Sequence, residues 1–148
     1  MNLSDLYQDV ILDHGKRPRN FGELPMATHE AEGFNPLCGD QLHLRLLVEE
    51  GRITDIRFNG CGCAISTASA SMLTQAIKGK SVNFARDLFE KFHRAAISGD
   101  AGEDEEALGE LVSLIGVHQY ANRVKCATLA WHALHAAIEE TAGSVTTE

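Results

Sequence analysis

The sequence contains no run of apolar residues that approaches the roughly 20 needed for a membrane-spanning helix. It has only four cysteines and no apolar N-terminal segment like that of a secretory signal, so a secreted disulfide framework is not expected. Basic residues are in the minority, with 13 Lys and Arg against 21 Asp and Glu and a net charge of −8. This balance argues against nucleic acid or an anionic membrane as the main partner. We therefore expect a cytoplasmic protein with reduced thiols.

Internal repeats and domain linkers are also absent, and 148 residues are enough to build one hydrophobic core. Hydrophobic residues make up 44% of the chain and charged residues 23%, which is typical of a globular protein. We therefore expect a single domain over residues 1–148, with the tail after residue 142 frayed.

Two segments alternate apolar and polar residues in the way that strands do. Residues 42–48 place leucine or valine at every second position, and residues 53–58 return as the second strand of a hairpin. An earlier strand at residues 29–33 has a weaker pattern. Residues 3–14 instead repeat apolar positions at helical spacing.

The sequence after residue 63 is helical in pattern throughout. We expect helices at residues 64–78, 82–97, 103–114 and 124–138. Strands followed by helices predict an α+β fold, with the helices packed on one face of a small antiparallel sheet.

Three cysteines and one aspartate have surroundings that suit a metal better than a hydrophobic core. Cys38 lies in a turn sequence ahead of a strand, and Asp40 follows two residues later. Cys63 and Cys126 lie at or near predicted helix starts, where free N–H groups stabilise a thiolate. Three thiolates and a carboxylate could close a tetrahedral zinc site or hold an iron–sulfur cluster. The carboxylate indicates a site whose coordination can change, because structural zinc sites usually take only Cys and His.

Spacing alone leaves a second interpretation open. Buried cysteines can behave as small hydrophobic residues, and Asp40 could serve only to cap a turn. The chain has no Cys-x-x-Cys pair that would decide between these interpretations.

The residues around the cysteines resemble the three cysteine motifs of the U-type iron–sulfur cluster assembly proteins. These motifs are Asn35-Pro36-Leu37-Cys38-Gly39-Asp40, Gly60-Cys61-Gly62-Cys63-Ala64-Ile65-Ser66 and Arg123-Val124-Lys125-Cys126-Ala127-Thr128-Leu129. Leu12-Asp13-His14 and Pro18-Arg19-Asn20-Phe21-Gly22 also look like the N-terminal signature of that family. The resemblance implies a three-stranded antiparallel sheet covered by helices. It also implies that Cys38, Asp40, Cys63 and Cys126 are the metal ligands.

Two features resemble the SufU-like branch of this family rather than its scaffold proteins. Lys125 stands where the scaffolds usually have a histidine, and residues 116–123 contain no segment like Leu-Pro-Pro-Val-Lys. The region between the second and third cysteines is also longer, with acidic residues among positions 100–110. The resemblance implies zinc at the site and a protein that accepts sulfur from a pyridoxal-phosphate cysteine desulfurase. Downstream iron–sulfur assembly proteins would be further partners.

In this interpretation Cys38 is the acceptor, because its turn is more flexible than a helix. Arg123, one helical turn before Cys126, could steady the anionic ligands or an incoming persulfide. The protein would act as a sulfurtransferase-like acceptor rather than as a stand-alone enzyme. The alternative is a scaffold that assembles and transfers a [2Fe–2S] cluster, with iron at the same ligands. A purely structural zinc module is disfavoured by Asp40.

Cys61 and the acidic run at residues 103–106 each allow two interpretations. Cys61 either ends a strand and points away from the metal, or supplies an auxiliary thiol that resolves a persulfide or pairs with Cys63 on oxidation. The acidic run at residues 103–106 is either a solvated helix start or a docking patch for a basic partner surface.

Overall fold

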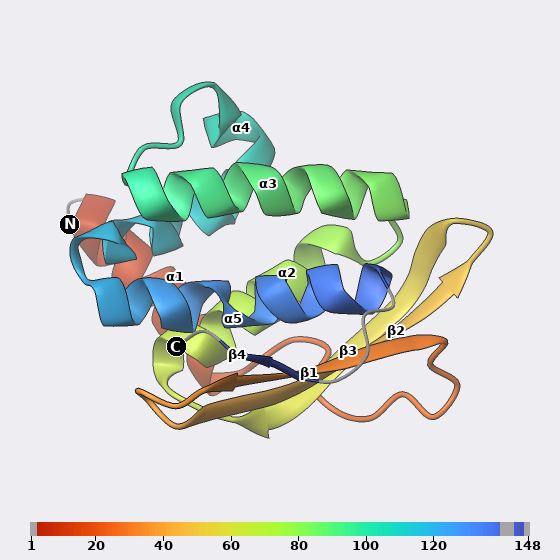
Figure 1. The fold of residues 1–148 in the computed structure, drawn as a ribbon. Coiled ribbons are helices and arrows are strands. Elements are labelled where there is room, and N and C mark those ends of the chain that lie inside the picture. The colour runs from red at the N-terminus through yellow and green to blue at the C-terminus, as the bar shows by residue number, and fades with distance from the viewer. Residues whose placement is uncertain (1–2, 140–143, 147–148) are drawn as a thin grey trace.

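A computed structural model describes residues 3–139 and 144–146, and Figure 1 shows a layer of helices over one face of a twisted sheet. The elements in chain order are α1 (Leu3–Lys16), β1 (His29–Asn35), β2 (Asp40–Glu49), β3 (Arg52–Cys61), α2 (Ala64–Ile77), α3 (Val82–Ser98), the 3₁₀ segment η1 (Gly102–Asp104), α4 (Glu105–Leu108), the 3₁₀ segment η2 (Gly109–Gln119), α5 (Ala121–Ile138) and β4 (Ser144–Thr146). The predicted α+β class is confirmed. Among the described helices, none is long and apolar enough to cross a bilayer.

The three N-terminal strands form the predicted antiparallel sheet. β1 pairs with β2 from His29↔Leu46 to Asn35↔Asp40, and β2 pairs with β3 as a long hairpin. β1 has a weak sequence pattern because its inward positions hold Ala31, Gly33 and Asn35 rather than large apolar residues. The strand nevertheless continues two residues beyond the predicted range and delivers Asn35 to the end of the sheet.

A fourth strand extends this sheet beyond the predicted three. Ser144–Thr146 form β4, which runs parallel to β1 and pairs with residues 32–34 (Figure 1). This strand lies in the tail that was expected to fray, whereas residues 140–143 and 147–148 lie outside the described residues. Hydrogen bonding to the free edge of β1 gives these three residues a regular structure that their own sequence does not predict.

The core lies between the inner face of the sheet and the helices. Trp131 on α5 is fully buried, and its ring stacks on that of Phe92 with 4.7 Å between the ring centroids. Its Nε1 donates to the hydroxyl of Ser69 on α2 at 3.1 Å, so the polar atom of the indole has a partner. Small residues of α2 therefore allow α5 to pack closely against it.

The predicted helix at residues 103–114 is wrong in its continuity. The chain forms η1, the short α4 and then η2 in this region. Gly109, at φ 55° and ψ −126°, ends α4 in a backbone conformation that only glycine adopts readily. Along this broken path η2 packs against α1, α3 and α5.

Candidate metal centre

The turn between β1 and β2 holds Cys38 at the surface of the protein. The N–H of Gly39 donates to the carbonyl of Asn35 at 2.8 Å, and the N–H of Leu37 donates to the Asn35 side-chain oxygen at 3.3 Å. Gly39 has φ 73°, a left-handed conformation that costs glycine little. The chain therefore reverses tightly, with Cys38 exposed and Asp40 starting β2 opposite Asn35.

Three of the four predicted ligands come together at this turn. Cys38, Asp40 and Cys126 offer donor atoms that all lie within 4.8 Å of one another. The Sγ atoms of Cys38 and Cys126 are 3.3 Å apart, although 88 positions separate the two residues. Asp40 and Cys126 are fully buried, whereas Cys38 is exposed. Two donors are thus fixed inside the domain and one lies at its surface.

Cys63, the fourth predicted ligand, lies beside this group of three rather than within it. It is the N-cap residue of α2, and its Sγ accepts a hydrogen bond from the N–H of Ser66 at 3.4 Å. Its own N–H donates to Asp40 Oδ1 at 2.8 Å, and its Sγ lies 4.0 Å from Asp40 Oδ2. Gly62 allows this close approach, because a Cβ atom at position 62 would lie 2.7 Å from Asp40 Oδ1. Asp40 therefore connects the Cys38 turn to the start of α2.

Cys126 is positioned by α5, but not at the N-terminus of that helix. α5 begins at Ala121, so Cys126 lies in the second turn, and the prediction that free N–H groups favour its thiolate is wrong. Burial raises the pKa of the Cys126 thiol well above its usual range, and hydrogen bonds with Cys38, Asp40 and Cys63 raise it further. Ionising this thiol therefore requires a positive charge nearby. A metal cation fits the buried sulfur and carboxylate donors on this ground.

Asn35 is a site residue that the sequence interpretation missed. Its side chain is fully buried, and Nδ2 donates to Asp40 Oδ2 at 3.3 Å and to Cys126 Sγ at 3.5 Å. The side-chain oxygen of Asn35 also accepts a hydrogen bond from the N–H of Leu37 in the turn. Asn35 therefore contacts Asp40, Cys126 and the turn that carries Cys38. Its signal in the sequence was its place at the start of the Asn35–Asp40 motif, and in the structure it occupies the last inward position of β1.

Arg123 lies at the surface beside the cysteines. Electrostatic interaction with Cys63, followed by that with Cys126, raises the pKa of the Arg123 guanidinium. The side chain is exposed.

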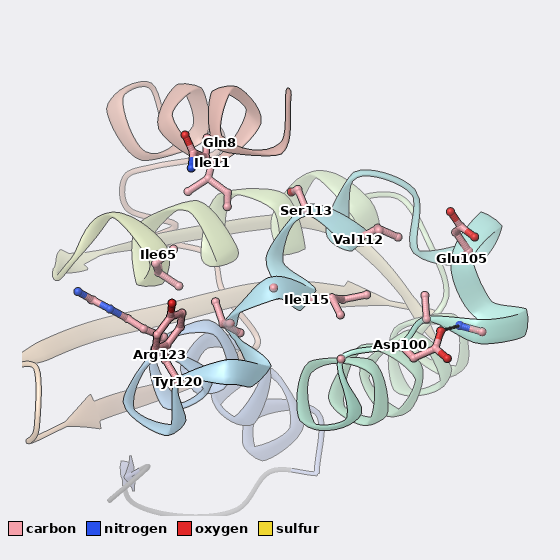
Figure 2. A pocket seen from close by; sticks show the side chains of 15 residues that line it. Gln8, Ile11, Ile65, Asp100, Glu105, Val112, Ser113, Ile115, Tyr120 and Arg123 are labelled. Atoms are coloured by element: carbon pink, nitrogen blue, oxygen red, sulfur yellow. Dashed lines mark hydrogen bonds between the residues drawn. The ribbon is translucent and has the colours of Figure 1, made fainter. Parts of the chain in front are cut away.

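Arg123 also lines one end of a cavity of about 900 Å³ (Figure 2). Figure 2 shows Arg123 and Tyr120 at one end, Ile115 near the middle, and Asp100 and Glu105 at the opposite end. The cavity therefore runs from Arg123 to the acidic region of the chain.

Comparison with known proteins gives the family. The sequence profile of the NifU-like N-terminal domain matches residues 6–147. The chain belongs to this family. An iron–sulfur cluster assembly scaffold protein IscU from Streptococcus pyogenes serotype M1 is 42% identical over 96% of this chain and 88% of its own length. A zinc-dependent sulfurtransferase SufU from Bacillus subtilis (strain 168) is 41% identical over 96% of this chain and 95% of its own length.

Solved structures of this family share the fold. A crystal structure from Fervidobacterium islandicum AW-1, described as a candidate iron–sulfur cluster assembly scaffold protein for the SUF system, has a TM-score of 0.83. It is 31% identical and covers 93% of this chain and 99% of that chain. The resemblance to the U-type proteins is therefore confirmed at the level of the family.

Cys61 and the pair His132 and His135 carry side chains that can bind a metal, but they lie outside the group formed by Cys38, Asp40 and Cys126. Cys61 is exposed at the end of β3, where it pairs with Gln41, and lies outside the group of three close donors. His132 and His135 pack around Phe89, with ring centroids 5.7 Å and 5.3 Å away.

Proposed function

We propose that this protein is a zinc-dependent sulfur acceptor in iron–sulfur cluster assembly. It takes persulfide sulfur from a pyridoxal-phosphate cysteine desulfurase in the cytoplasm and passes it toward downstream assembly proteins. The observation that carries the proposal is the contact between an exposed thiol and a buried one, with the Sγ atoms of Cys38 and Cys126 3.3 Å apart. Such a pair places a reactive sulfur at the surface while its partner stays anchored in the core.

In this proposal Cys38, Asp40, Cys63 and Cys126 are the metal ligands. Zinc at these donors would supply the positive charge that keeps the thiols deprotonated. Asn35 orients Asp40 and Cys126 by donating to both, as residues behind a metal ligand commonly do. The proposal agrees with the name of the Bacillus subtilis relative, a zinc-dependent sulfurtransferase.

Cys38 is the proposed acceptor because it is the exposed donor and lies on a turn. Its thiolate attacks the terminal sulfur of the desulfurase persulfide, R–S–SH. A new S–S bond forms between Cys38 and the terminal sulfur, and the S–S bond of the desulfurase persulfide breaks. The desulfurase leaves as the thiolate R–S⁻ with the bonding electron pair, and the proton stays on the transferred sulfur. No external oxidant or reductant is needed.

Arg123 assists by attracting the leaving thiolate or the persulfide to the site. Its exposed guanidinium already lies in the field of Cys63 and Cys126. Charge-assisted hydrogen bonds to anions are the strong ones, so this single side chain can orient the incoming sulfur group.

The second candidate function is a scaffold that assembles and transfers a [2Fe–2S] cluster. The Streptococcus pyogenes relative is named a scaffold protein, and the same cysteines with Asp40 could hold iron. Lys125, which replaces the usual histidine of the scaffold proteins, favours the sulfur acceptor.

Elemental analysis of protein purified without oxygen, combined with its visible spectrum, separates the two functions. About one zinc per chain and no colour are expected of the sulfur acceptor. Iron and sulfide with a brown chromophore would instead assign the scaffold. The zinc-bearing protein should then accept ³⁵S from the desulfurase, and failure to do so would reject sulfur acceptance.

A further inference from the structure

The cavity beside the metal centre has charges of opposite sign at its two ends. Arg123 lines the end near the cysteines, and Asp100 and Glu105 line the other (Figure 2). Between them the wall is mainly apolar, with Ile11 of α1 and Val112 of η2 facing the same space. A groove of about 900 Å³ lies near the upper limit of common ligand sites, roughly 1,000 Å³.

The acidic run beside this groove is not one uniform solvated face. Asp104 is turned toward α3, where its carboxylate lies 3.2 Å from the guanidinium of Arg94. Glu105 instead lines the cavity, together with Asp100 from the preceding loop. Asp100 Oδ1 accepts from the N–H of Gly102 at 2.8 Å, which fixes the carboxylate at the rim. Two negative charges are therefore held at the groove, while a third is paired elsewhere.

Tyr120 lies at the Arg123 end of the groove and offers a contact for a bound partner. Its side chain is 63% exposed although it borders an apolar cavity, and it lies three positions before Arg123. Exposed tyrosine and arginine beside an apolar pocket are the residue types that carry binding energy at protein interfaces.

We infer that this groove binds the loop of the cysteine desulfurase that carries its reactive cysteine, in one fixed direction. The sulfur-bearing end of the loop lies at Arg123, apolar side chains fill the middle, and a lysine or arginine of the loop meets Asp100 and Glu105. The charge order of the groove sets this direction, because the reversed loop would place a cation at Arg123 and the sulfur anion against two carboxylates. The inference rests on the proposed sulfur-acceptor function and adds how its partner is recognised.

The test compares two double variants that change the net charge equally. Asp100→Asn with Glu105→Gln removes the two groove charges, and Asn at position 100 keeps the oxygen that accepts from Gly102. Glu103→Gln with Glu106→Gln removes two exposed charges outside the set of described residues that line the groove. The probe is the pyridoxal-phosphate-loaded desulfurase from the same genome, with its Kd measured by calorimetry at two salt concentrations.

The groove variant is expected to raise Kd by about three- to tenfold and to weaken its salt dependence, while the control stays close to wild type. Tyr120→Ala should also weaken binding, in contrast to Phe84→Ala, which removes an exposed ring outside the described lining. Equal effects of the two double variants would show only long-range attraction and would overturn the inference, as would no effect of either.

Sulfur transfer to the wild-type protein is measured in the same preparations. If the wild type accepts ³⁵S while the groove variant binds like the control, the groove inference is wrong and the proposed function stands. If the wild type neither binds the desulfurase nor accepts sulfur, the proposed function fails, and the inference fails with it.

Discussion

The side-chain amide of Asn35 contacts Cys126, 91 positions further along the chain, with 3.5 Å between its Nδ2 and Cys126 Sγ. The same nitrogen donates to Asp40 Oδ2 at 3.3 Å. One buried amide at the end of β1 therefore sets the relative positions of a strand carboxylate and a helix thiol.

Replacing Asn35 with alanine should destabilise both the fold and the metal site. Buried Asp40 and Cys126 lose a donor, so the free energy of unfolding should fall by about 1–3 kcal/mol. Zinc affinity should fall by roughly 10- to 100-fold, as is usual when a residue behind a ligand is lost. Chemical denaturation and competition with a chromophoric chelator measure the two effects. Asn59→Ala, on a half-buried residue of β3, is the control, and equal zinc loss in both variants would contradict the role of Asn35.

Replacing Cys38 with serine should abolish ³⁵S acceptance while the domain stays folded. Cys38 is exposed on a turn, so its loss removes the acceptor sulfur and little packing. Cys61→Ser is the matched control, because Cys61 is also exposed but lies outside the close donor group. Retained acceptance in Cys38→Ser, or its loss in Cys61→Ser alone, would move the acceptor role to another thiol.

Gly62→Ala should weaken metal binding by displacing Asp40. The new Cβ would lie 2.7 Å from Asp40 Oδ1, so the carboxylate or the start of α2 must shift. We expect at least a tenfold loss of zinc affinity, comparable to the loss of a residue behind a ligand. Gly116→Ala is the control, since among the described residues beyond its neighbours in the chain no atom lies within 4 Å of its Cβ position. Unchanged affinity in Gly62→Ala would show that the site tolerates movement of Asp40.

Acidification should destabilise the protein partly through His132. Burial, and then the charges of His93 and His135, lower the pKa of the His132 imidazole in the folded state. The unfolded chain, with a histidine pKa of about 6.5, therefore binds this proton first as the pH falls. The free energy of unfolding therefore falls as the pH drops below about 6.5 toward the pKa of His132 in the folded state. The same drop in pH should lower the free energy of unfolding of His132→Phe by less than that of the wild type.

Urea denaturation of wild type and His132→Phe from about pH 8 to about pH 5.5 measures this effect. Titrating groups that do not interact with His132 cancel in the difference between the two proteins, which should be constant above the histidine range. A difference that stays constant down to pH 5.5 would contradict the contribution of His132.

The sequence predicted the parts of the fold whose pattern comes from burial on one face. In β2, Leu42, Leu44 and Leu46 alternate cleanly because each of them enters the core. β1 was weaker because Gly33 and Asn35 serve the core and the site rather than hydrophobic burial. β4 could not be predicted, since its pairing depends on a partner more than 100 positions earlier in the chain.

The candidate ligands could be chosen from their motifs, but their spatial arrangement could not. Cys126 was expected near a helix start because the helical pattern was assigned only from residue 124. The helix α5 begins three residues earlier, at Ala121, and its N-cap residue Tyr120 makes no side-chain cap that would have marked this start. The contact of Cys126 with Cys38 depends on α5 packing across the sheet. The groove was equally hidden, because it arises from the glycine-broken path of residues 99–119.

β4 connects the C-terminal segment to the strand that leads into the Cys38 turn. It pairs with residues 32–34, and Asn35 and Cys38 follow directly in the chain. Trimming the protein before Ser144 would leave the backbone donors and acceptors of β1 open along the margin of the sheet. Such an open margin invites strand-to-strand self-association, and here it would occur next to the reactive thiol. A shortened protein could therefore precipitate or dimerise, and its sulfur chemistry would then be misjudged.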